Sequence, residues 1–320
     1  MASCNNTIAS ELLPFLRVYQ DGTVERLLES PFAPPSPEDP TTGISSKDVT
    51  ISPLVSARLY APKLSPTTHQ RKLPILVYFH GGGFCIGSAF SCLCHDYMNS
   101  LVSQANVIAV SAEYRLAPEH PVQAAYEDSW TALQWVALHS LEDTMNKDPW
   151  LIENGDLDRV YIGGDSAGGN IAHNLTIRAG TKGLFGGVKI LGAFLSHPYF
   201  WGSDPIGSKS LSAHEENVLH KTWAFVYPAS GGMDHPMINP LACDAPSLSG
   251  IGCSRLLICV AEMDALRERG IRYAEAVRES GWGGDLELFE VEGEDHCFHI
   301  MNPGSDNAKN MLNRLASFLQ

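Results

Sequence analysis

The chain has 320 residues, of which 44% are hydrophobic and 18% are charged, and its formal net charge is −14 at pH 7. This composition is typical of a soluble globular protein with one large domain or two modest ones. The excess of carboxylates argues against nucleic acid or an anionic membrane as a partner, and no stretch approaches the roughly 18 consecutive apolar residues of a membrane-spanning helix.

Residues 1–20 contain neither a basic leader nor a sustained apolar run, so we expect a cytoplasmic protein. The eight cysteines are scattered through the chain, which favours reduced thiols over a disulfide framework. Cys92 and Cys94 form a C-x-C pair without further ligand spacing. We therefore predict no metal site, and no motif in the chain calls for a cofactor.

Residues 1–45 are predicted to form an N-terminal extension ahead of the main sheet. A hairpin is expected from residues 15–19 and 23–28, which flank Asp21-Gly22. Residues 30–40 are too rich in proline for a helix or a central strand. Such an extension could act as a lid over a site.

Two further strands are predicted at residues 47–51 and 56–60, followed by a polar loop at residues 62–72. Beyond residue 73, buried strands alternate with helical patterns, which predicts βαβ units and a mostly parallel sheet with helices on both faces. The predicted strands are residues 75–79, 107–111, 160–163, 189–195, 256–260 and 286–291. The predicted helices are residues 91–105, 123–140, 167–179, 267–280 and 307–319.

Residues 198–252 interrupt this alternation. The segment is rich in aromatic residues and proline, with one helical pattern at residues 213–227, and it is predicted to be a cap-like insertion above the sheet. The chain contains no internal repeat and no low-complexity linker. We therefore predict a single α/β domain spanning residues 1–320.

The strand at residues 160–163 leads into Gly164-Asp165-Ser166-Ala167-Gly168 and then into a helical pattern. G-x-S-x-G between a strand and a helix predicts a nucleophile elbow, a sharp turn that exposes the hydroxyl of its central serine. The turn requires small neighbours, which Gly164 and Gly168 supply. With 28 glycines in the chain, an ordinary glycine-rich turn is the alternative. The prediction that Ser166 is the nucleophile therefore depends on its partners.

A serine nucleophile needs a base, and the base needs a third group to orient it. The strand at residues 256–260 leads to Asp264, and the strand at residues 286–291 leads to His296. Ser166, Asp264 and His296 thus follow the chain order serine, acid, histidine, which is typical of a catalytic triad whose serine lies in a nucleophile elbow. Glu262 is the alternative acid, and His299 is the alternative base.

The third requirement is a site for the developing oxyanion. His80-Gly81-Gly82-Gly83 follows the strand at residues 75–79, and glycines leave backbone N–H groups accessible. We predict that the N–H groups of Gly82, Gly83 and Ala167 are the donors, with a flexible turn as the alternative. Aromatic residues in or beside these loops could line an apolar pocket, although core packing explains each of them as well: Phe84, Tyr199, Trp201, Trp223 and Phe298.

Taken together, the motifs resemble the hormone-sensitive-lipase-like branch of the α/β-hydrolases, and plant carboxylesterases of that branch most fully. The resemblance covers almost the whole chain and rests on HGGG at residues 80–83, YRLAPE at residues 114–119, GDSAG at residues 164–168, DPWL at residues 148–151, and Asp264 with His296. It implies the α/β-hydrolase fold, with an N-terminal extension and an inserted cap.

Three other groups in this family are also similar. Gibberellin receptors lack the catalytic histidine, whereas this chain has His296. Among 2-hydroxyisoflavanone dehydratases a subgroup carries threonine as the nucleophile, whereas this chain has Ser166. Indole-alkaloid cyclases tend to lack parts of the triad and the third loop glycine, which is Gly83 here.

The sequence therefore predicts a serine carboxylesterase that hydrolyses a small apolar or acetylated ester through an acyl-enzyme. The resemblance implies that the ester is a plant specialised metabolite. The alternatives are a lyase, dehydratase or cyclase of the same fold that acts by elimination, and a small-molecule receptor. The expected partner is the small-molecule ester.

Overall fold

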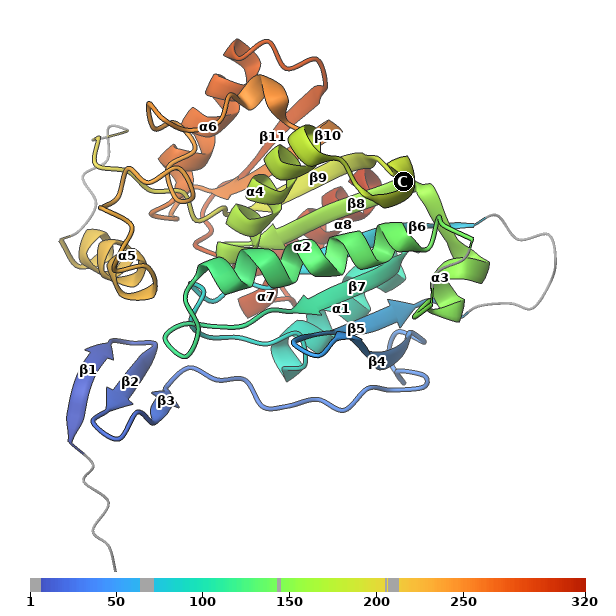
Figure 1. The fold of residues 1–320 in the computed structure, drawn as a ribbon, viewed down its shortest axis with the longest axis horizontal. Coiled ribbons are helices and arrows are strands. Elements are labelled where there is room, and N and C mark those ends of the chain that lie inside the picture. Colours follow the sequence, from blue (N-terminus) through green and yellow to red (C-terminus); the bar gives the residue numbers. More distant parts are fainter. Residues whose placement is uncertain (1–6, 64–71, 143–144, 205, 207–212) are drawn as a thin grey trace, which may run out of the picture.

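The computed structural model describes residues 7–63, 72–142, 145–204, 206 and 213–320 (Figure 1). Most of the predicted polar loop at residues 62–72 lies outside these residues. In the part of the chain that is described, no helix has both the length and the apolarity needed to cross a membrane.

An eight-stranded sheet with the order β11-β10-β9-β8-β6-β7-β5-β4 forms the centre of the molecule. The six strands β6 to β11 are parallel to one another, and β4 and β5 add an antiparallel edge. The strands are β4 (Ser45–Ser52), β5 (Val55–Ala61), β6 (Leu73–Phe79), β7 (Ile108–Glu113), β8 (Gly155–Asp165), β9 (Ile190–Ser196), β10 (Cys253–Ala261) and β11 (Asp285–Val291). The predicted mostly parallel sheet is confirmed.

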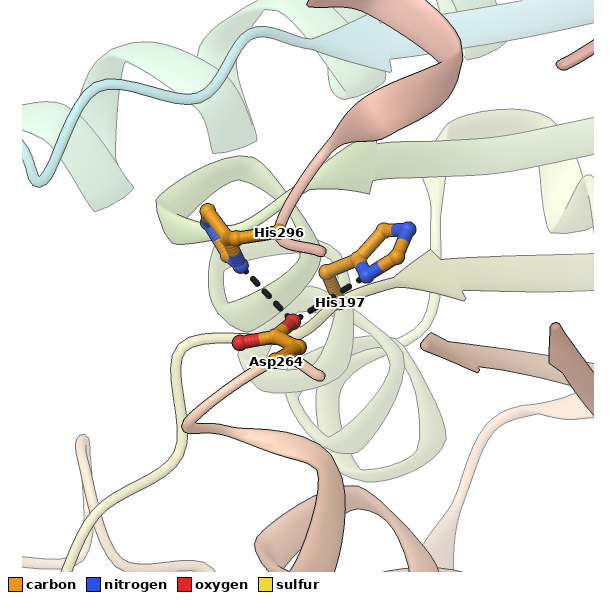
Figure 2. Close-up of side chains that lie close together, drawn as sticks. All are labelled: His197, Asp264 and His296. Carbon is orange, nitrogen blue, oxygen red and sulfur yellow. Dashed lines mark hydrogen bonds and ion pairs between the residues drawn. The ribbon is translucent and has the colours of Figure 1, made fainter. Parts of the chain in front are cut away.

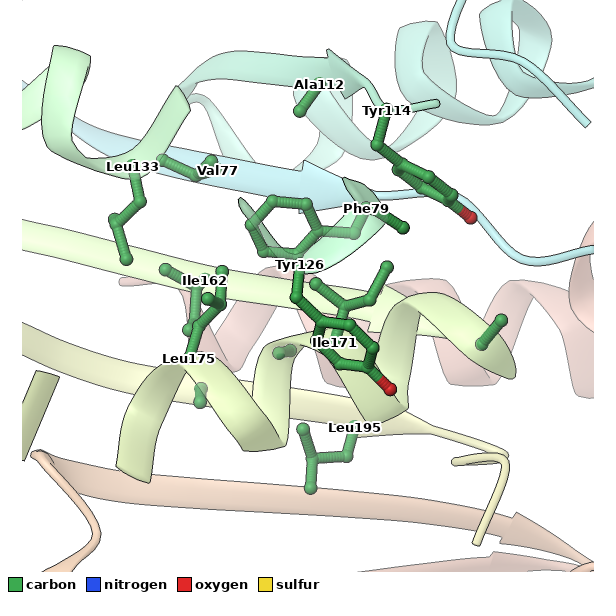
Figure 3. Packing of buried hydrophobic residues seen from close by; sticks show 14 of the residues in the cluster. Val77, Phe79, Ala112, Tyr114, Tyr126, Leu133, Ile162, Ile171, Leu175 and Leu195 are labelled. Carbon is green, nitrogen blue, oxygen red and sulfur yellow. The ribbon is translucent and has the colours of Figure 1, made fainter. Parts of the chain in front are cut away.

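Helices cover both faces of this sheet because successive residues of a buried strand point to opposite sides. One core includes residues of α2 (Gln123–Leu138), α4 (Ala167–Lys182) and α6 (Arg267–Glu279); the other includes residues of α1 (Cys92–Ala105) and α8 (Asp306–Phe318). On β6, Val77 belongs to the first core and Leu76 to the second. Figure 3 shows the first core, where Val77 and Ile162 of the sheet lie beside Leu133 of α2. The predicted arrangement of helices is therefore also confirmed.

The remaining elements are short or lie outside the alternating pattern. They are α3 (Pro149–Asn154), α5 (Ala213–Val226), α7 (Phe298–Met301) and two 3₁₀ turns, η1 (Phe185–Gly187) and η2 (Leu248–Gly250). The helix α5 confirms the helical pattern predicted within residues 198–252. The helix α3 was not predicted.

A separate three-stranded sheet precedes the main one and consists of β1 (Ile8–Leu12), β2 (Leu16–Tyr19) and β3 (Val24–Arg26). The strands β2 and β3 are the predicted hairpin, and β1 is an additional strand. Arg26 fastens this sheet to the main domain: its Nε donates to the carbonyl oxygen of Cys85 at 2.8 Å, and its guanidinium forms two hydrogen bonds with Glu119. In Figure 1 this sheet and α5 lie toward the end of the molecule at which β8 ends.

Glu113, the last residue of β7, is expected to make stability depend on pH. Its Oε2 accepts hydrogen bonds from the Ala89 N–H at 2.7 Å and the Ser88 hydroxyl at 3.0 Å, but burial outweighs both and raises its pKa to about 7. The folded chain therefore holds a proton that the unfolded chain has already lost, and this contribution to stability falls as the pH rises from about 4.5 through about 7.

The variant Glu113→Gln removes this contribution. Relative to the parent protein, its free energy of unfolding should rise by about 3 kcal/mol between pH 4.5 and pH 8. Urea unfolding of both proteins at several pH values measures the difference. Burial lowers the pKa of His80 to about 4, which has the opposite effect on stability, but it acts in both proteins and cancels. A difference that does not change with pH would contradict the assignment.

Candidate active site

Ser166 occupies the sharp turn between β8 and α4. Its backbone angles are φ 54° and ψ −115°, a conformation that a residue with a side chain rarely adopts and that is typical of strained functional sites. A Cβ at Gly164 would lie 2.4 Å from the carbonyl oxygen of Phe79, and one at Gly168 would lie 1.9 Å from it. Both positions therefore require glycine, as the motif indicates, because the turn sits directly against the end of β6.

Asp264 and His296 come together from the ends of β10 and β11. His296 Nδ1 lies 2.8 Å from Asp264 Oδ2, and the Leu266 N–H donates to Asp264 Oδ1 at 2.8 Å. Burial raises the pKa of the Asp264 carboxyl, but His296 and His197 lower it by more, so the net pKa lies well below the usual range. Asp264 is therefore a carboxylate that only accepts hydrogen bonds, and His296 donates to it from Nδ1.

When the His296 ring is neutral, the bond from its Nδ1 to Asp264 leaves Nε2 as the acceptor. Burial lowers the pKa of His296, but the neighbouring Cys297 and Asp264 raise it by more, so the net pKa lies above its ordinary value. The side chain is 36% exposed, which leaves it open to small molecules. A histidine with this partner and this access can serve as a general base.

The two alternative residues occupy other positions. Glu262 Oε2 accepts a hydrogen bond from the Gly293 N–H at 2.9 Å. His299 Nε2 lies 2.8 Å from Asp165 Oδ1, although the two atoms are not aligned for a hydrogen bond. The structure thus pairs Asp264 with His296, and their catalytic roles remain a prediction.

The loop after β6 lies against the Ser166 turn. A Cβ at Gly81 would be 3.0 Å from the carbonyl oxygen of Asp165 and 3.4 Å from the Cβ of Ser166. Gly82 and Gly83 have φ angles of 113° and 58°. Within the described residues, the backbone N–H groups of Gly82, Gly83 and Ala167 have no hydrogen-bond partner. The three predicted oxyanion donors are therefore available.

His80 holds this loop in place. Its ring stacks on Tyr114 with the centroids 4.2 Å apart, and the Tyr114 hydroxyl donates to the His80 carbonyl oxygen at 2.7 Å. Because burial lowers the pKa of His80 to about 4, its ring is neutral at pH 7. These contacts agree with a structural role for His80.

Of the five aromatic residues suggested as pocket lining, three form one group. The ring of Phe84 lies 6.1 Å from that of Tyr199 and 6.2 Å from that of Trp223. Trp201 belongs to the same core and packs under the guanidinium of Arg269, whereas Phe298 belongs to the core on the opposite side of the sheet, with α1 and α8. All five are buried, so their contact with a substrate remains a prediction.

Sequence reasoning missed a second histidine on Asp264. His197 follows the end of β9 directly, and its Nδ1 lies 3.1 Å from the Oδ2 atom that also binds His296 (Figure 2). The signal was its place at the end of a predicted strand. Among the residues that are described, these three side chains form a group with metal-ligating atoms, all within 4.8 Å of one another. A metal ion would need both histidine Nδ1 atoms without their protons. It would therefore replace the two hydrogen bonds that these atoms donate to Asp264, and we assign the group to hydrogen bonding.

Comparison with known proteins gives a consistent family signature. A model of the alpha/beta hydrolase fold matches residues 76–300. A 2-hydroxyisoflavanone dehydratase from Glycyrrhiza echinata is 56% identical over 100% of both chains, and probable carboxylesterase 2 from Arabidopsis thaliana is 45% identical over 100% of this chain and 98% of its own. Among solved structures, a thermostable carboxylesterase cloned from a metagenomic library has a TM-score of 0.70 at 26% identity, covering 91% of this chain and 90% of its own. The relatives are thus named for two different reactions.

Proposed function

The chain belongs to the alpha/beta hydrolase fold family, and from this we propose that it is a serine carboxylesterase acting on small apolar or acetylated esters. The observation that carries the proposal is the hydrogen bond of 2.8 Å between Asp264 and His296. These two residues follow β10 and β11, which are parallel strands of the sheet in which β8 leads into the Ser166 turn. A base with an oriented ring and a serine in a strained turn are the parts that acyl transfer requires.

In the proposed reaction, His296 Nε2 accepts the Ser166 proton as the hydroxyl oxygen attacks the ester carbonyl. The N–H groups of Gly82, Gly83 and Ala167 bind the resulting oxyanion, each contributing roughly 3 kcal/mol in the transition state. The alcohol leaves with the proton from His296. A water molecule, deprotonated by the same ring, then attacks the acyl group and releases the acid, which restores the serine.

The surroundings of the oxyanion loop support an apolar substrate. Phe84, directly after Gly83, groups with Tyr199 and Trp223. The Tyr199 hydroxyl is already bonded to the carbonyl oxygen of Leu219, so this buried group surrounds the loop with apolar rings rather than charge. The relatives named above from two plants favour a plant specialised metabolite as the ester.

Elimination is the second candidate, because the relative that is 56% identical is named a dehydratase. In that reaction His296 removes a proton from an acidic carbon, the oxyanion loop holds the enolate, and water or a carboxylic acid leaves. The nucleophilic hydroxyl of Ser166 is then not needed for a covalent step.

Turnover in ¹⁸O-labelled water distinguishes the two reactions. With a short-chain nitrophenyl ester, we expect the released acid to contain one ¹⁸O atom above the enzyme-free blank. With a 2-hydroxyisoflavanone or an acetylated alkaloid precursor, elimination would give a product that has lost water or acetic acid and contains no ¹⁸O. The proposal fails if only elimination is detected. If neither reaction occurs and a small acid binds tightly, the chain is a receptor.

A further inference from the structure

His197 is held in one position by the main chain around it. It follows β9, and its backbone N–H donates to the carbonyl oxygen of Cys259 on β10 at 2.8 Å. Its φ angle of 47° is unusual for a residue other than glycine. Such conformations persist where the surrounding structure enforces them, and they gather at functional sites.

The side chain of His197 binds the carboxylate that orients His296. Because Asp264 is ionised, His197 must donate from Nδ1 to Asp264 Oδ2, at 3.1 Å. Burial lowers the pKa of His197, so its ring is neutral. Its Nε2 is buried and has no hydrogen-bond partner among the described residues, which agrees with the tautomer that carries the proton on Nδ1.

Asp264 is thereby fixed at both oxygens. Oδ1 accepts from the Leu266 N–H, and Oδ2 accepts from both histidines, which lie on the loops after β9 and β11 (Figure 2). A carboxylate with a single donor on Oδ2 could rotate and carry His296 with it. The second donor removes that freedom.

His299 lies between His197 and the residue that precedes Ser166. The ring of His197 lies parallel to that of His299, with centroids 5.5 Å apart and an interplanar angle of 14°. His299 in turn lies beside Asp165, the residue that precedes Ser166, and the Tyr78 hydroxyl donates to the other carboxylate oxygen of Asp165 at 2.6 Å. His197 is therefore set between the acid of the proposed triad and the turn that carries the serine.

We propose that His197 is a positioning residue for the reaction, which acts by holding the Asp264 carboxylate so that His296 points its free nitrogen at the serine. The inference rests on the proposed function. It concerns the rate of the chemical step and not the binding of substrate, because the His197 side chain is buried and its Nδ1 binds Asp264.

Two variants of His197 separate the hydrogen bond from simple packing. Asparagine can place its amide N–H near the position of the histidine Nδ1, whereas leucine fills similar space without a donor. With a short-chain nitrophenyl ester, His197→Leu should lower kcat roughly 10- to 100-fold and change KM by less than about twofold. His197→Asn should recover most of kcat.

His173→Leu is the matched control. His173 is also buried and neutral, and its Nδ1 pairs with the Tyr273 hydroxyl at 2.8 Å, away from Asp264. His173→Leu should lower the melting temperature without changing kcat. Equal losses of kcat in His197→Leu and His197→Asn, or an unchanged kcat in His197→Leu, would overturn the positioning role. An inactive parent protein would instead overturn the proposed function.

Discussion

Replacing Ser166 by alanine is expected to lower kcat for a short-chain nitrophenyl ester roughly 10⁴- to 10⁶-fold. The substitution removes the one oxygen that forms the acyl-enzyme, whereas the oxyanion donors and the Asp264–His296 pair stay in place. Because alanine is smaller than serine and the turn already accommodates a Cβ at this position, the stability of the fold should change little. Steady-state kinetics and the melting temperature together measure the two effects.

An organophosphate probe gives an independent readout of the same assignment. The parent protein should gain the mass of one phosphonyl group on the peptide that contains Ser166, and Ser166→Ala should gain none. Ser100→Ala is the control, because Ser100 lies on α1 and its hydroxyl donates to the carbonyl oxygen of Asp96. It should retain full activity and full labelling. Turnover that is unchanged in Ser166→Ala would rule out the esterase mechanism.

Replacing Gly168 by alanine is expected to lower the free energy of unfolding by more than about 3 kcal/mol. The new Cβ would be 1.9 Å from the carbonyl oxygen of Phe79 and 2.7 Å from that of His80, and backbone atoms cannot rotate away as a side chain can. The turn and the oxyanion loop would have to separate. Activity should therefore fall together with stability, which urea unfolding and kinetics can follow on the same samples.

Gly304→Ala provides the comparison for this effect. A Cβ at Gly304 would have no atom within 4 Å, and the residue does not have a positive φ angle. Its stability should change by less than about 0.5 kcal/mol. If Gly168→Ala changed the free energy of unfolding as little as Gly304→Ala does, the turn could not lie as close to β6 as described.

The strands and helices of the main domain could be predicted because burial imposes a period on the sequence. The parallel strands are near-continuous apolar runs, and the long helices repeat at helical spacing. The helix α3 is too short for such a repeat, although Asp148 caps it and Pro149 occupies its first turn. The strand β1 is exposed over all but its last residue and therefore carries no alternation. Patterns fail where an element has no buried face.

The candidate site was partly predictable for a different reason. In a parallel sheet, residues that follow strand ends meet at one edge, so the meeting of Asp264 and His296 could be inferred from order alone. The same rule would have found His197. Side-chain packing has no such rule: Phe298 and Trp201 were suggested as pocket lining because their loops are near the site, and this stays a prediction. Their actual neighbours depend on the fold of those loops.

The order of the strands also determines which part of the candidate site is lost first when the sheet opens locally. Ser166 follows β8, which has neighbours on both sides, whereas His296 follows β11, the last strand of the sheet. Only the final residue of β11 is fully buried, whereas the last six residues of β8 are all buried. Local openings of this kind need less free energy than global unfolding. We therefore expect mild heating to inactivate molecules whose central strands are still paired, so that activity is lost before the chain denatures.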